Sequence, residues 1–377
     1  MIIKSLSVRN FRNIASADFI FDPKVNIFTG NNAQGKTNLC EAISVCFGKS
    51  FRSTRPAELI PFGSAEKTTE IELCFTFDGM PGKENVIRYE QNGSRSRLKF
   101  NDIELKEAEK LYGALRYVLF IPEDLYIVKG DPSVRRDYVD FVANMINRVH
   151  NVKLYEYNKA LKQKNNILIN MEPGDKSAAL MLESWNDTIA KFGVNVMCGR
   201  IRHFGSLSAL AARFYGQING GAEQLTMRYE STVMGETPFT ADDVELMYDT
   251  YKRRLTETAE RELKMKYTLV GAHRDDVSFA VDGMNAKDFA SQGQIRSIAV
   301  ALKLAEAQMI REKSGDLPVI ILDDVLSELD AVRRSFIINH IDEHQVFITS
   351  CNLADTDKFN NGRIWNVSGG RFELKEG

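Results

Sequence analysis

The sequence is short of the features that mark secreted, membrane-spanning and strongly basic proteins. It has five cysteines in 377 residues and no C-x-x-C pair. A disulfide framework and a cysteine-based zinc site are therefore not expected, and the isolated thiols indicate a reducing compartment. No apolar run approaches the ~20 residues that cross a bilayer. We expect a cytoplasmic protein with no membrane segment.

Excess positive charge is also missing. Lys and Arg number 49 against 51 Asp and Glu, which gives a net charge of −2. The overall charge therefore does not identify a nucleic-acid-binding protein, and any contact with DNA must come from local patches. A chain of this length is expected to form about two domains.

The strongest motif is GNNAQGKT at residues 30–37, which matches the phosphate-binding loop G-x-x-x-x-G-K-[ST]. An apolar run of strand length precedes it, and apolar residues with helical spacing follow it. Such a loop wraps backbone N–H groups around a phosphate at a helix N-terminus. We expect Lys36 to reach the β- and γ-phosphates of ATP and Thr37 to bind Mg²⁺. The expected ATP-binding residues are Gly30, Asn31, Asn32, Ala33, Gln34, Gly35, Lys36 and Thr37.

A second motif follows the apolar strand predicted at residues 319–322. In P-loop enzymes an acidic residue at such a strand end holds Mg²⁺, and a neighbouring carboxylate can deprotonate the attacking water. Asp323 is predicted to be the metal-side residue and Asp324 the catalytic base. Nearly the whole chain separates Thr37 from Asp323, so the two can share one Mg²⁺ only if the two ends of the chain fold together.

The chain between these motifs changes character twice. Apolar and polar residues alternate over 69–105 as in an antiparallel meander, with a hairpin turn expected at Asn92-Gly93. Helical spacing recurs over 137–170, 176–215 and 241–264. We therefore predict an α/β fold with two domains. The predicted domains are a P-loop ATPase head of residues 1–125 and 265–377, with a mixed sheet and an antiparallel β meander, and an inserted helical arm of residues 126–264.

A second phosphate-binding turn is predicted at Ser291-Gln292-Gly293-Gln294, directly before an amphipathic helix. A helix start of this kind can bind an anion, although most helices begin with a similar cap. If the P-loop already wraps the nucleotide, this turn has a phosphate to bind only when a second protomer presents the turn across an interface. The turn would then meet the γ-phosphate of a nucleotide bound by the other protomer.

Other basic residues allow two interpretations each. Arg9 and Arg12 lie just before the P-loop strand and could either reach a bound nucleotide or be solvated surface residues. Two clusters could face DNA or simply be solvated, and these are Arg95, Arg97 and Lys99, and Lys252, Arg253 and Arg254. The H-x-x-E-H pattern at residues 340–344 has no third ligand evident nearby, so no zinc site is expected there.

Several blocks, in this order and spacing, resemble the ATP-binding-cassette (ABC) heads of SMC and related DNA-repair ATPases, and within that group the bacterial RecF family. They are NFRN (10–13), GNNAQGKTNLCEAI (30–43), GKSFR (48–52), PEDL with IVKGDPSVRRDYVD (122–140), GAHRDD (271–276), SQGQIRS (291–297) and LDDVLSELD (322–330). The resemblance implies a slow, DNA-stimulated ATPase that dimerises on ATP. It also implies binding to gapped DNA or single-/double-strand junctions, and work with RecO and RecR in loading RecA.

The resemblance also assigns roles within the head. Asp323 would be the Walker B residue and Asp324 the catalytic carboxylate, Ser291 would open the signature motif that acts in trans, and Ser327 and Asp330 would belong to the D-loop. Ala272 stands where the family usually has proline. The switch histidine of transporter-type cassettes has no counterpart at Thr349-Ser350-Cys351, which makes Thr349 or Ser350 the expected γ-phosphate sensor.

Three other functions of P-loop proteins fit the rest of this sequence less well. A chromosome-structuring ATPase of the SMC class needs a long coiled-coil arm, and the insertion is short and lacks sustained heptads. The ATPase subunit of a membrane importer is not forbidden, although the arginine-bearing N-terminal link and the helical insertion favour DNA. A plain P-loop kinase gives the S-Q-G-Q turn no role.

Overall fold

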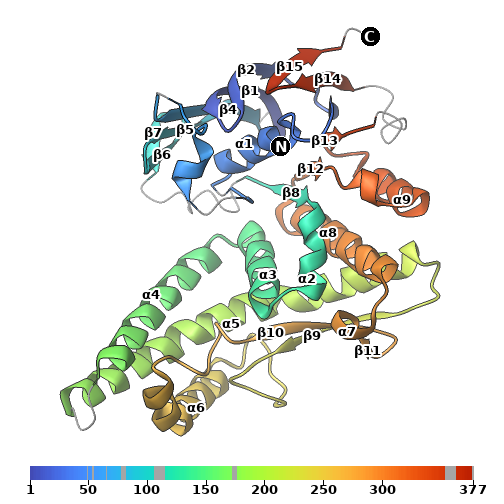
Figure 1. Ribbon diagram of the computed structural model, residues 1–377. Helices are drawn as coiled ribbons and strands as arrows, with labels where there is room; N and C mark the ends of the chain where they lie inside the picture. The colour runs from blue at the N-terminus through green and yellow to red at the C-terminus, as the bar shows by residue number, and fades with distance from the viewer. Residues whose placement is uncertain are drawn as a thin grey trace. The chain divides into compact units, whose positions relative to one another are not determined.

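The chain divides into two compact units in the computed structural model. Unit 1 comprises Met1–Asp124 and Leu302–Gly377, and unit 2 comprises Leu125–Ala301 (Figure 1). The structure describes residues 1–48, 50–52, 55–64, 66–77, 82–105, 115–171, 176–352 and 362–375. The first boundary lies next to the predicted one, whereas the second follows Ala301 and not Lys264. The stretch after Lys264 joins unit 2 because its strand pairs with a strand inside the predicted insertion.

One sheet of unit 1 is antiparallel throughout, in the order β2-β1-β4-β5-β6-β7. Its strands are β1 (Ile2–Phe11), β2 (Ile14–Ile20), β4 (Thr68–Thr76), β5 (Glu84–Asn92), β6 (Arg95–Phe100) and β7 (Ile103–Leu105). The predicted meander is confirmed where the structure describes it. Asn92 pairs with Arg95, so the hairpin turn is Gly93-Ser94, one residue later than expected, with Gly93 at φ 59°.

The second sheet of unit 1 has the order β15-β14-β3-β13-β12-β8 and is parallel except for β15, which makes it a mixed sheet. Its strands are β3 (Val25–Thr29), β8 (Tyr117–Phe120), β12 (Val319–Asp323), β13 (Val346–Ser350), β14 (Arg363–Ser368) and β15 (Arg371–Leu374). Strands β8, β12 and β13 are buried along their whole length, as expected of parallel strands covered on both faces. The mixed sheet confirms the predicted head architecture.

Helix α1 (Lys36–Cys46) packs between the two sheets of unit 1. It contacts β1, β4 and β5 of the antiparallel sheet and β12 and β13 of the mixed sheet. Leu39, Ala42 and Ile43 are fully buried on it, as their spacing predicts. Helix α9 (Ala331–Ile341) connects β12 to β13, and short 3-10 helices are η1 (Pro56–Leu59), η3 (Pro122–Leu125) and η4 (Leu326–Glu328).

Unit 2 combines long helices with a small sheet. Its elements are α2 (Tyr126–Lys129), α3 (Pro132–Ile146), α4 (Val149–Asn170), α5 (Lys176–Ile218), β9 (Leu225–Glu230), α6 (Val244–Met265), β10 (Asp276–Val281), β11 (Met284–Asn285) and α7 (Ala286–Phe289). Helix α8 (Gln292–Ser314) starts in unit 2 and ends in unit 1. The helix predicted over 137–170 is two helices with a break at Asn147. The predicted arm is not wholly helical, because β9 pairs with β10.

A buried polar network organises the core of unit 2. Arg200 donates to both carboxylate oxygens of Asp140, each at 2.8 Å, and to the carbonyl of Ala272 at 2.6 Å. His150 Nε2 lies 2.8 Å from the same carboxylate. Burial opposes ionisation of Asp140, but the Arg200 guanidinium outweighs it and lowers the pKa of that carboxyl. The network anchors the GAHRDD segment to helices α3, α4 and α5.

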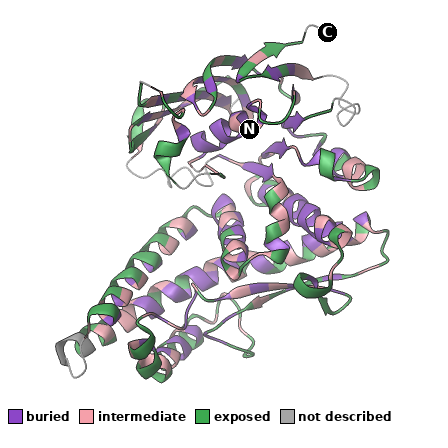
Figure 2. Cartoon of the chain, in the orientation of Figure 1, coloured by how far each residue is buried: buried purple, intermediate pink, exposed green. Residues whose placement is uncertain are grey.

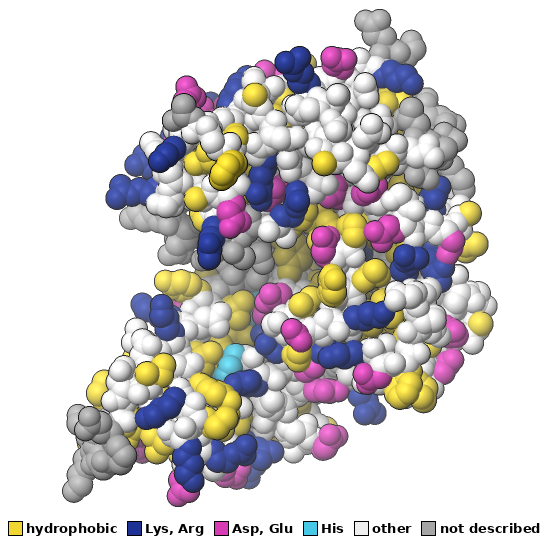
Figure 3. All heavy atoms as spheres, viewed as in Figure 1, with side chains coloured by type: hydrophobic (Ala, Val, Ile, Leu, Met, Phe, Trp, Pro, Cys, Tyr) yellow, Lys and Arg dark blue, Asp and Glu magenta, His cyan; other side chains and the backbone are white. Residues whose placement is uncertain are grey.

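Charges of both signs are visible on one face of the molecule, in keeping with the net charge of −2. Lys and Arg lie among Asp and Glu on the face shown in Figure 3. Buried residues follow the inner sides of the helices, and much of α4 is exposed (Figure 2). Among the described residues, no helix combines the length and the apolar composition that crossing a bilayer requires.

Unit 1 also buries a charged cluster on α8. Lys303 Nζ donates to Glu306 Oε2 at 2.6 Å, and both side chains are buried. Glu306 Oε1 has no hydrogen-bond partner among the described residues. Burial raises the pKa of Glu306 to about 7 and that of Asp124, which faces Lys303, to about 6. The cluster therefore holds a proton that is released as the pH rises toward neutrality.

The substitution Glu306→Gln tests this cluster. The ordinary pKa of 4.5 is raised to about 7 by folding, so the folded state holds the proton more tightly. The stability from the protonated carboxyl is complete below the unfolded pKa and is lost as the pH rises through the folded pKa. Because glutamine does not titrate, the free energy of unfolding of the variant relative to wild type should rise by on the order of 2–3 kcal/mol between about pH 5 and pH 8. Urea unfolding of both proteins at several pH values measures this difference in unfolding free energy. The exposed Glu312→Gln on the same helix is the control, and a difference that stays constant with pH would contradict the prediction.

Candidate nucleotide-binding site

The predicted phosphate-binding loop joins β3 to α1, as its flanking sequence indicates. Two glycines in it allow a close approach of other segments. A Cβ at Gly30 would lie 2.2 Å from the carbonyl oxygen of Val367 in β14, and one at Gly35, which has φ 114°, would lie 2.7 Å from the Asn13 side chain. The loop is therefore held between the β1–β2 turn and the C-terminal hairpin.

Lys36 turns back over its own loop. Its side chain is buried, and Nζ donates to the carbonyl oxygens of Gly30 at 2.6 Å and Asn31 at 2.9 Å. The ammonium thus lies at the loop and not in bulk solvent. A phosphate bound by the loop would contact it there.

Thr37 and Asp323 meet although 286 positions separate them. The Thr37 hydroxyl donates to Asp323 Oδ1 at 3.0 Å, and the Thr349 hydroxyl donates to the same oxygen at 2.7 Å. The order and register of the strands explain why they meet. Strand β13 lies between β3, which leads into the P-loop, and β12, which ends at Asp323, and Thr349 of β13 pairs with Phe28 on one side and Asp323 on the other. Burial raises the pKa of Asp323, and the hydrogen bonds from Thr349 and Thr37 act against that rise.

Asp324 continues from the end of β12 with an uncommon backbone. Its φ is 54°, in the left-handed region that non-glycine residues rarely adopt. Its N–H donates to Thr349 Oγ1 at 2.9 Å, and Ser327 Oγ donates to its carbonyl oxygen at 2.7 Å. These bonds hold Asp324 half-exposed beside the buried Asp323. Asp330, the second predicted D-loop residue, caps α9 by accepting from the N–H of Arg333 at 2.9 Å.

The two N-terminal arginines differ in their surroundings. Arg9 pairs with exposed Asp18 at 2.7 Å across the β1–β2 hairpin. Arg12 donates to both oxygens of Glu41, at 2.9 and 2.7 Å, and to the carbonyl of Glu58 at 2.8 Å. Glu41 is fully buried on α1. Of the two residues, Arg12 therefore lies against the helix that follows the P-loop.

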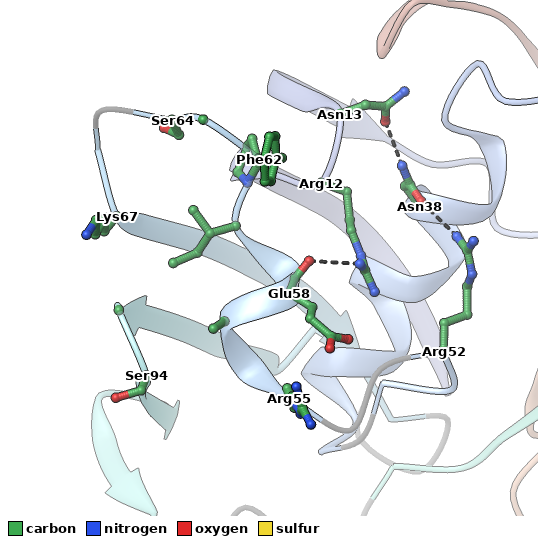
Figure 4. Close-up of a pocket in the computed structure, with 15 residues that line it drawn as sticks. Arg12, Asn13, Asn38, Arg52, Arg55, Glu58, Phe62, Ser64, Lys67 and Ser94 are labelled. Atoms are coloured by element: carbon green, nitrogen blue, oxygen red, sulfur yellow. Dashed lines mark hydrogen bonds between the residues drawn. The ribbon is translucent and has the colours of Figure 1, made fainter.

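Arg12 also lines a pocket of about 1100 Å³ in unit 1 (Figure 4). A chain of side chains crosses one wall: Arg52 donates to Asn38 Oδ1 at 3.0 Å, and Asn38 donates to Asn13 Oδ1 at 2.7 Å. Phe62 also lines the pocket, with its ring fully exposed. Since Asn38 directly follows Thr37, the pocket adjoins the phosphate-binding loop.

Sequence reasoning missed the contacts that hold the loop from outside. Asn13 Nδ2 donates to the carbonyl of Gln34 at 3.1 Å, and the N–H of Gly370 donates to the same carbonyl at 2.8 Å. The N–H of Gly369 donates to Gln34 Oε1 at 2.6 Å. Gly369 and Gly370 form the turn between β14 and β15. The pair of glycines signals a turn, but nothing in the sequence indicates what that turn touches.

The Ser291–Gln294 turn belongs to unit 2. Gln294 N donates to Ser291 Oγ at 3.2 Å, and Ser291 N donates to Gln294 Oε1 at 2.7 Å, which is the reciprocal pattern of a capping box. Gln294 Nε2 also donates to Glu223 at 2.9 Å. Ser291 and Gln292 are exposed at the start of a 23-residue helix. The turn is therefore capped by its own side chains and accessible.

Most of the predicted DNA-binding residues have acidic neighbours. On β6, Lys99 lies 2.6 Å from Glu90 and Arg97 lies 3.9 Å from Glu104. On α6, Lys252 lies 3.3 Å from Asp187, whereas Arg253 and Arg254 lie 3.8 and 3.4 Å from Glu257. Arg95 is exposed and has no ion pair among the described residues.

Thr37 and Asp323 suit Mg²⁺ because both offer oxygen atoms from adjoining positions. Mg²⁺ is commonly bound by one or two carboxylates together with water and substrate phosphates. The described part of the chain has no group of three or more His, Cys, Asp or Glu side chains placed for a metal. In the H-x-x-E-H segment, His344 Nδ1 lies 2.8 Å from the carbonyl of Pro318 and His340 Nδ1 lies 2.7 Å from that of Phe336.

The Arg12–Glu41 pair is testable by substitution. Arg12→Met would leave the buried Glu41 carboxylate without its guanidinium, which should cost about 3–5 kcal/mol of unfolding free energy. Adding Glu41→Gln should recover most of that loss, because no buried charge would then remain unpaired. Arg9→Met is the matched control, since its exposed partner predicts a loss of less than about 1 kcal/mol. Urea unfolding distinguishes these cases, and equal losses for the two single variants would contradict the assignment.

Comparison with known proteins agrees with this geometry. The family model described as RecF/RecN/SMC N terminal domain matches residues 2–362. The DNA replication and repair protein RecF of Clostridium acetobutylicum is 34% identical over 375 residues and covers 99% of each chain. The protein of the same name from Lactobacillus johnsonii is 35% identical over 388 residues and covers 100% of each.

Solved structures extend the agreement to the fold. The recombination mediator protein RecF-ATP in the RecFOR pathway superposes with a TM-score of 0.90 at 30% identity, covering 100% of this chain and 98% of that one. An Smc head bound to the C-winged helix domain of ScpA has a TM-score of 0.57 at 15% identity, covers 100% of this chain and 97% of that one, and shares the fold. The fold is that of an ABC-type ATPase head, and the chain belongs to the RecF family of DNA replication and repair proteins.

Proposed function

We propose that this chain binds ATP and Mg²⁺ at the P-loop of unit 1, hydrolyses the ATP slowly, and dimerises while the nucleotide is bound. The observation that carries the proposal is the 3.0 Å hydrogen bond between Thr37 of the P-loop and Asp323 at the end of β12. It joins the two motifs that a P-loop ATPase needs around one metal ion. A RecF relative whose structure is described as RecF-ATP supports the choice of nucleotide.

The side chains divide the work of hydrolysis. The loop N–H groups and Lys36 would bind the phosphates, and Thr37 with Asp323 would hold Mg²⁺, which neutralises charge on the terminal phosphate when bound. Asp324 would take the proton from the attacking water. Thr349 would fix both carboxyl-bearing residues, since its hydroxyl donates to Asp323 and accepts from the N–H of Asp324. The pocket lined by Arg12 and Arg52 would receive the rest of the nucleotide.

The Ser291 turn of a second protomer would complete this site in trans. Its exposure and its position at the start of a 23-residue helix fit an anion-binding role. Two copies joined through their nucleotides would come apart after hydrolysis, because the ligand that links them would be lost. The dimer would thus exist only while ATP is intact.

The proposed target is DNA with a gap or a single-/double-strand junction. Family membership supports this, as does the description of a structural relative as a recombination mediator in the RecFOR pathway. We propose that the chain acts in the cytoplasm with RecO and RecR in loading RecA. ATP hydrolysis would serve to time release from DNA, as expected of a switch.

The decisive experiment is the ATP hydrolysis rate per protomer against protein concentration, with and without gapped duplex DNA. The rate should rise with concentration and again with DNA, since the site is completed in trans. Ser291→Arg should leave ATP binding nearly unchanged and abolish dimerisation and turnover. Glu260→Arg, an exposed change on α6, should behave as wild type. The proposal would be contradicted by a rate per protomer that changes neither with protein concentration nor with DNA, or by normal turnover in Ser291→Arg. Either result would favour the importer or kinase function instead.

The DNA surface is tested by the salt dependence of binding. Replacing Arg95, Arg97 and Lys99 by alanine should weaken DNA binding and reduce the slope of log K against log salt by up to roughly three units. A matched variant replaces Lys252, Arg253 and Arg254, each of which has a nearby carboxylate, whereas Arg95 of the first cluster has no ion pair among the described residues. A reduced slope only in this second variant would assign the DNA contact to α6.

A further inference from the structure

Cys351 lies among the residues that bind the phosphates. It directly follows β13, and its Sγ is 3.5 Å from Lys36 Nζ and 2.7 Å from Asn32 Oδ1. The two carboxylate oxygens of Asp324 lie 3.9 and 4.0 Å away. One thiol therefore adjoins the P-loop with its lysine and also the proposed catalytic base, which come from two distant parts of the sequence.

The two hydroxyls expected to act as the phosphate sensor have other partners. Thr349 Oγ1 donates to Asp323 at 2.7 Å and accepts from the N–H of Asp324 at 2.9 Å. Ser350 Oγ donates to the carbonyl of Asn352 at 2.9 Å. Thr349 therefore holds the acidic strand end, and Ser350 contributes to the turn after β13. Cys351 is the next side chain along this segment. It is exposed, and the acceptor of its thiol, Asn32 Oδ1, belongs to the phosphate-binding loop itself.

We propose that Cys351 contacts the terminal phosphate of ATP and makes the site distinguish ATP from ADP. The inference rests on the proposed ATPase function and assigns its sensor. A thiol is a weak hydrogen-bond donor and is small, so it could donate S–H to a terminal phosphate oxygen between Lys36 and Asp324 without bringing a charge. No bond to sulfur forms or breaks. ADP has no third phosphate for this thiol to contact, so the thiol should stay accessible when ADP is bound.

Cysteine chemistry provides a direct measurement. Among the described cysteines, Cys40, Cys46 and Cys198 are buried, Cys74 is half-buried and Cys351 is exposed. N-ethylmaleimide should therefore react first at Cys351, and peptide mass mapping reports each site separately. The assay uses the full chain carrying Ser291→Arg, so that a second protomer does not cover the thiol. A non-hydrolysable ATP analogue with Mg²⁺ should slow modification of Cys351 at least about tenfold, whereas ADP should slow it much less. Cys74 is the internal control and should react at one rate throughout.

Substitutions at Cys351 distinguish a direct contact with the phosphate from a purely structural role of this residue. Cys351→Ala should lower kcat about three- to tenfold, as expected when one weak hydrogen bond to the phosphate is lost, and should reduce the preference for ATP over ADP. Cys351→Ser keeps a donor at the same place and should restore both values. Affinity for ADP should be the same in all three proteins, and Cys74→Ser should match wild type.

The outcomes distinguish this inference from the proposed function. If the wild-type chain binds and hydrolyses ATP but Cys351→Ala keeps the wild-type kcat and ATP preference, Cys351 is not the sensor and the ATPase function stands. Equal protection of Cys351 by ADP and by the ATP analogue would likewise show that Cys351 is not the sensor, and would leave the ATPase function standing. If the wild-type chain binds no nucleotide, both proposals fail.

Discussion

The proposed nucleotide-binding site of unit 1 depends on the hydrogen bonding of three parallel strands, β3, β13 and β12. This ladder fixes which residues end at the same edge of the mixed sheet, and the carboxyl ends of neighbouring parallel strands are where α/β proteins bind ligands. Thr349 pairs with Asp323 on one side and with Phe28 on the other. A shift of one residue in the β12–β13 pairing would turn Thr349 away from Asp323, and a shift in the β13–β3 pairing would displace Thr349 relative to the strand that leads into the P-loop. The proposed chemistry therefore rests on backbone register before it rests on any side chain.

Several buried charges in each unit have a partner of opposite charge. Glu41 on α1 is paired with Arg12, and Asp140 in unit 2 is paired with Arg200. A buried ion is costly without a partner, so each pair also restricts which segments can pack together. Arg12 ties the β1–β2 turn to the helix after the P-loop. Arg200 ties the GAHRDD segment to the long helices. Sequence motifs alone left Arg12 with two interpretations and gave Arg200 no role.

The sequence predicted the parts of the proposed site whose chemistry is local. The P-loop, the acidic strand end and the capped turn at Ser291 were each found from spacing within a few residues. It also predicted a head with a mixed sheet and a meander, because alternation and apolar runs report burial directly. It misplaced the hairpin turn by one residue, since Asn92-Gly93 and Gly93-Ser94 fit the same pattern.

The missed features depend on tertiary packing. The Gln34 contacts with Asn13 and Gly370 join segments that are far apart in the sequence. Strand β9 lies in a stretch of mixed composition and becomes a strand by pairing with β10. Thr349 meets Asp323 because β13 pairs with β12, and no single segment of the sequence states which strands become neighbours. Such contacts follow from the assembled fold and could not be read from any single segment.

The contacts between the N- and C-terminal parts of unit 1 bear on the order in which a ribosome could build this site. The P-loop leaves the ribosome early, but its sheet lacks β12 and β13 until more than 300 residues are made, and the β14–β15 turn that bonds Gln34 comes later still. Ile3 of the first strand likewise waits for Gln345. Unit 2 is one continuous stretch and can complete its own contacts first. A nascent chain therefore carries the phosphate-binding motif for most of its synthesis without the carboxylates that would act on ATP.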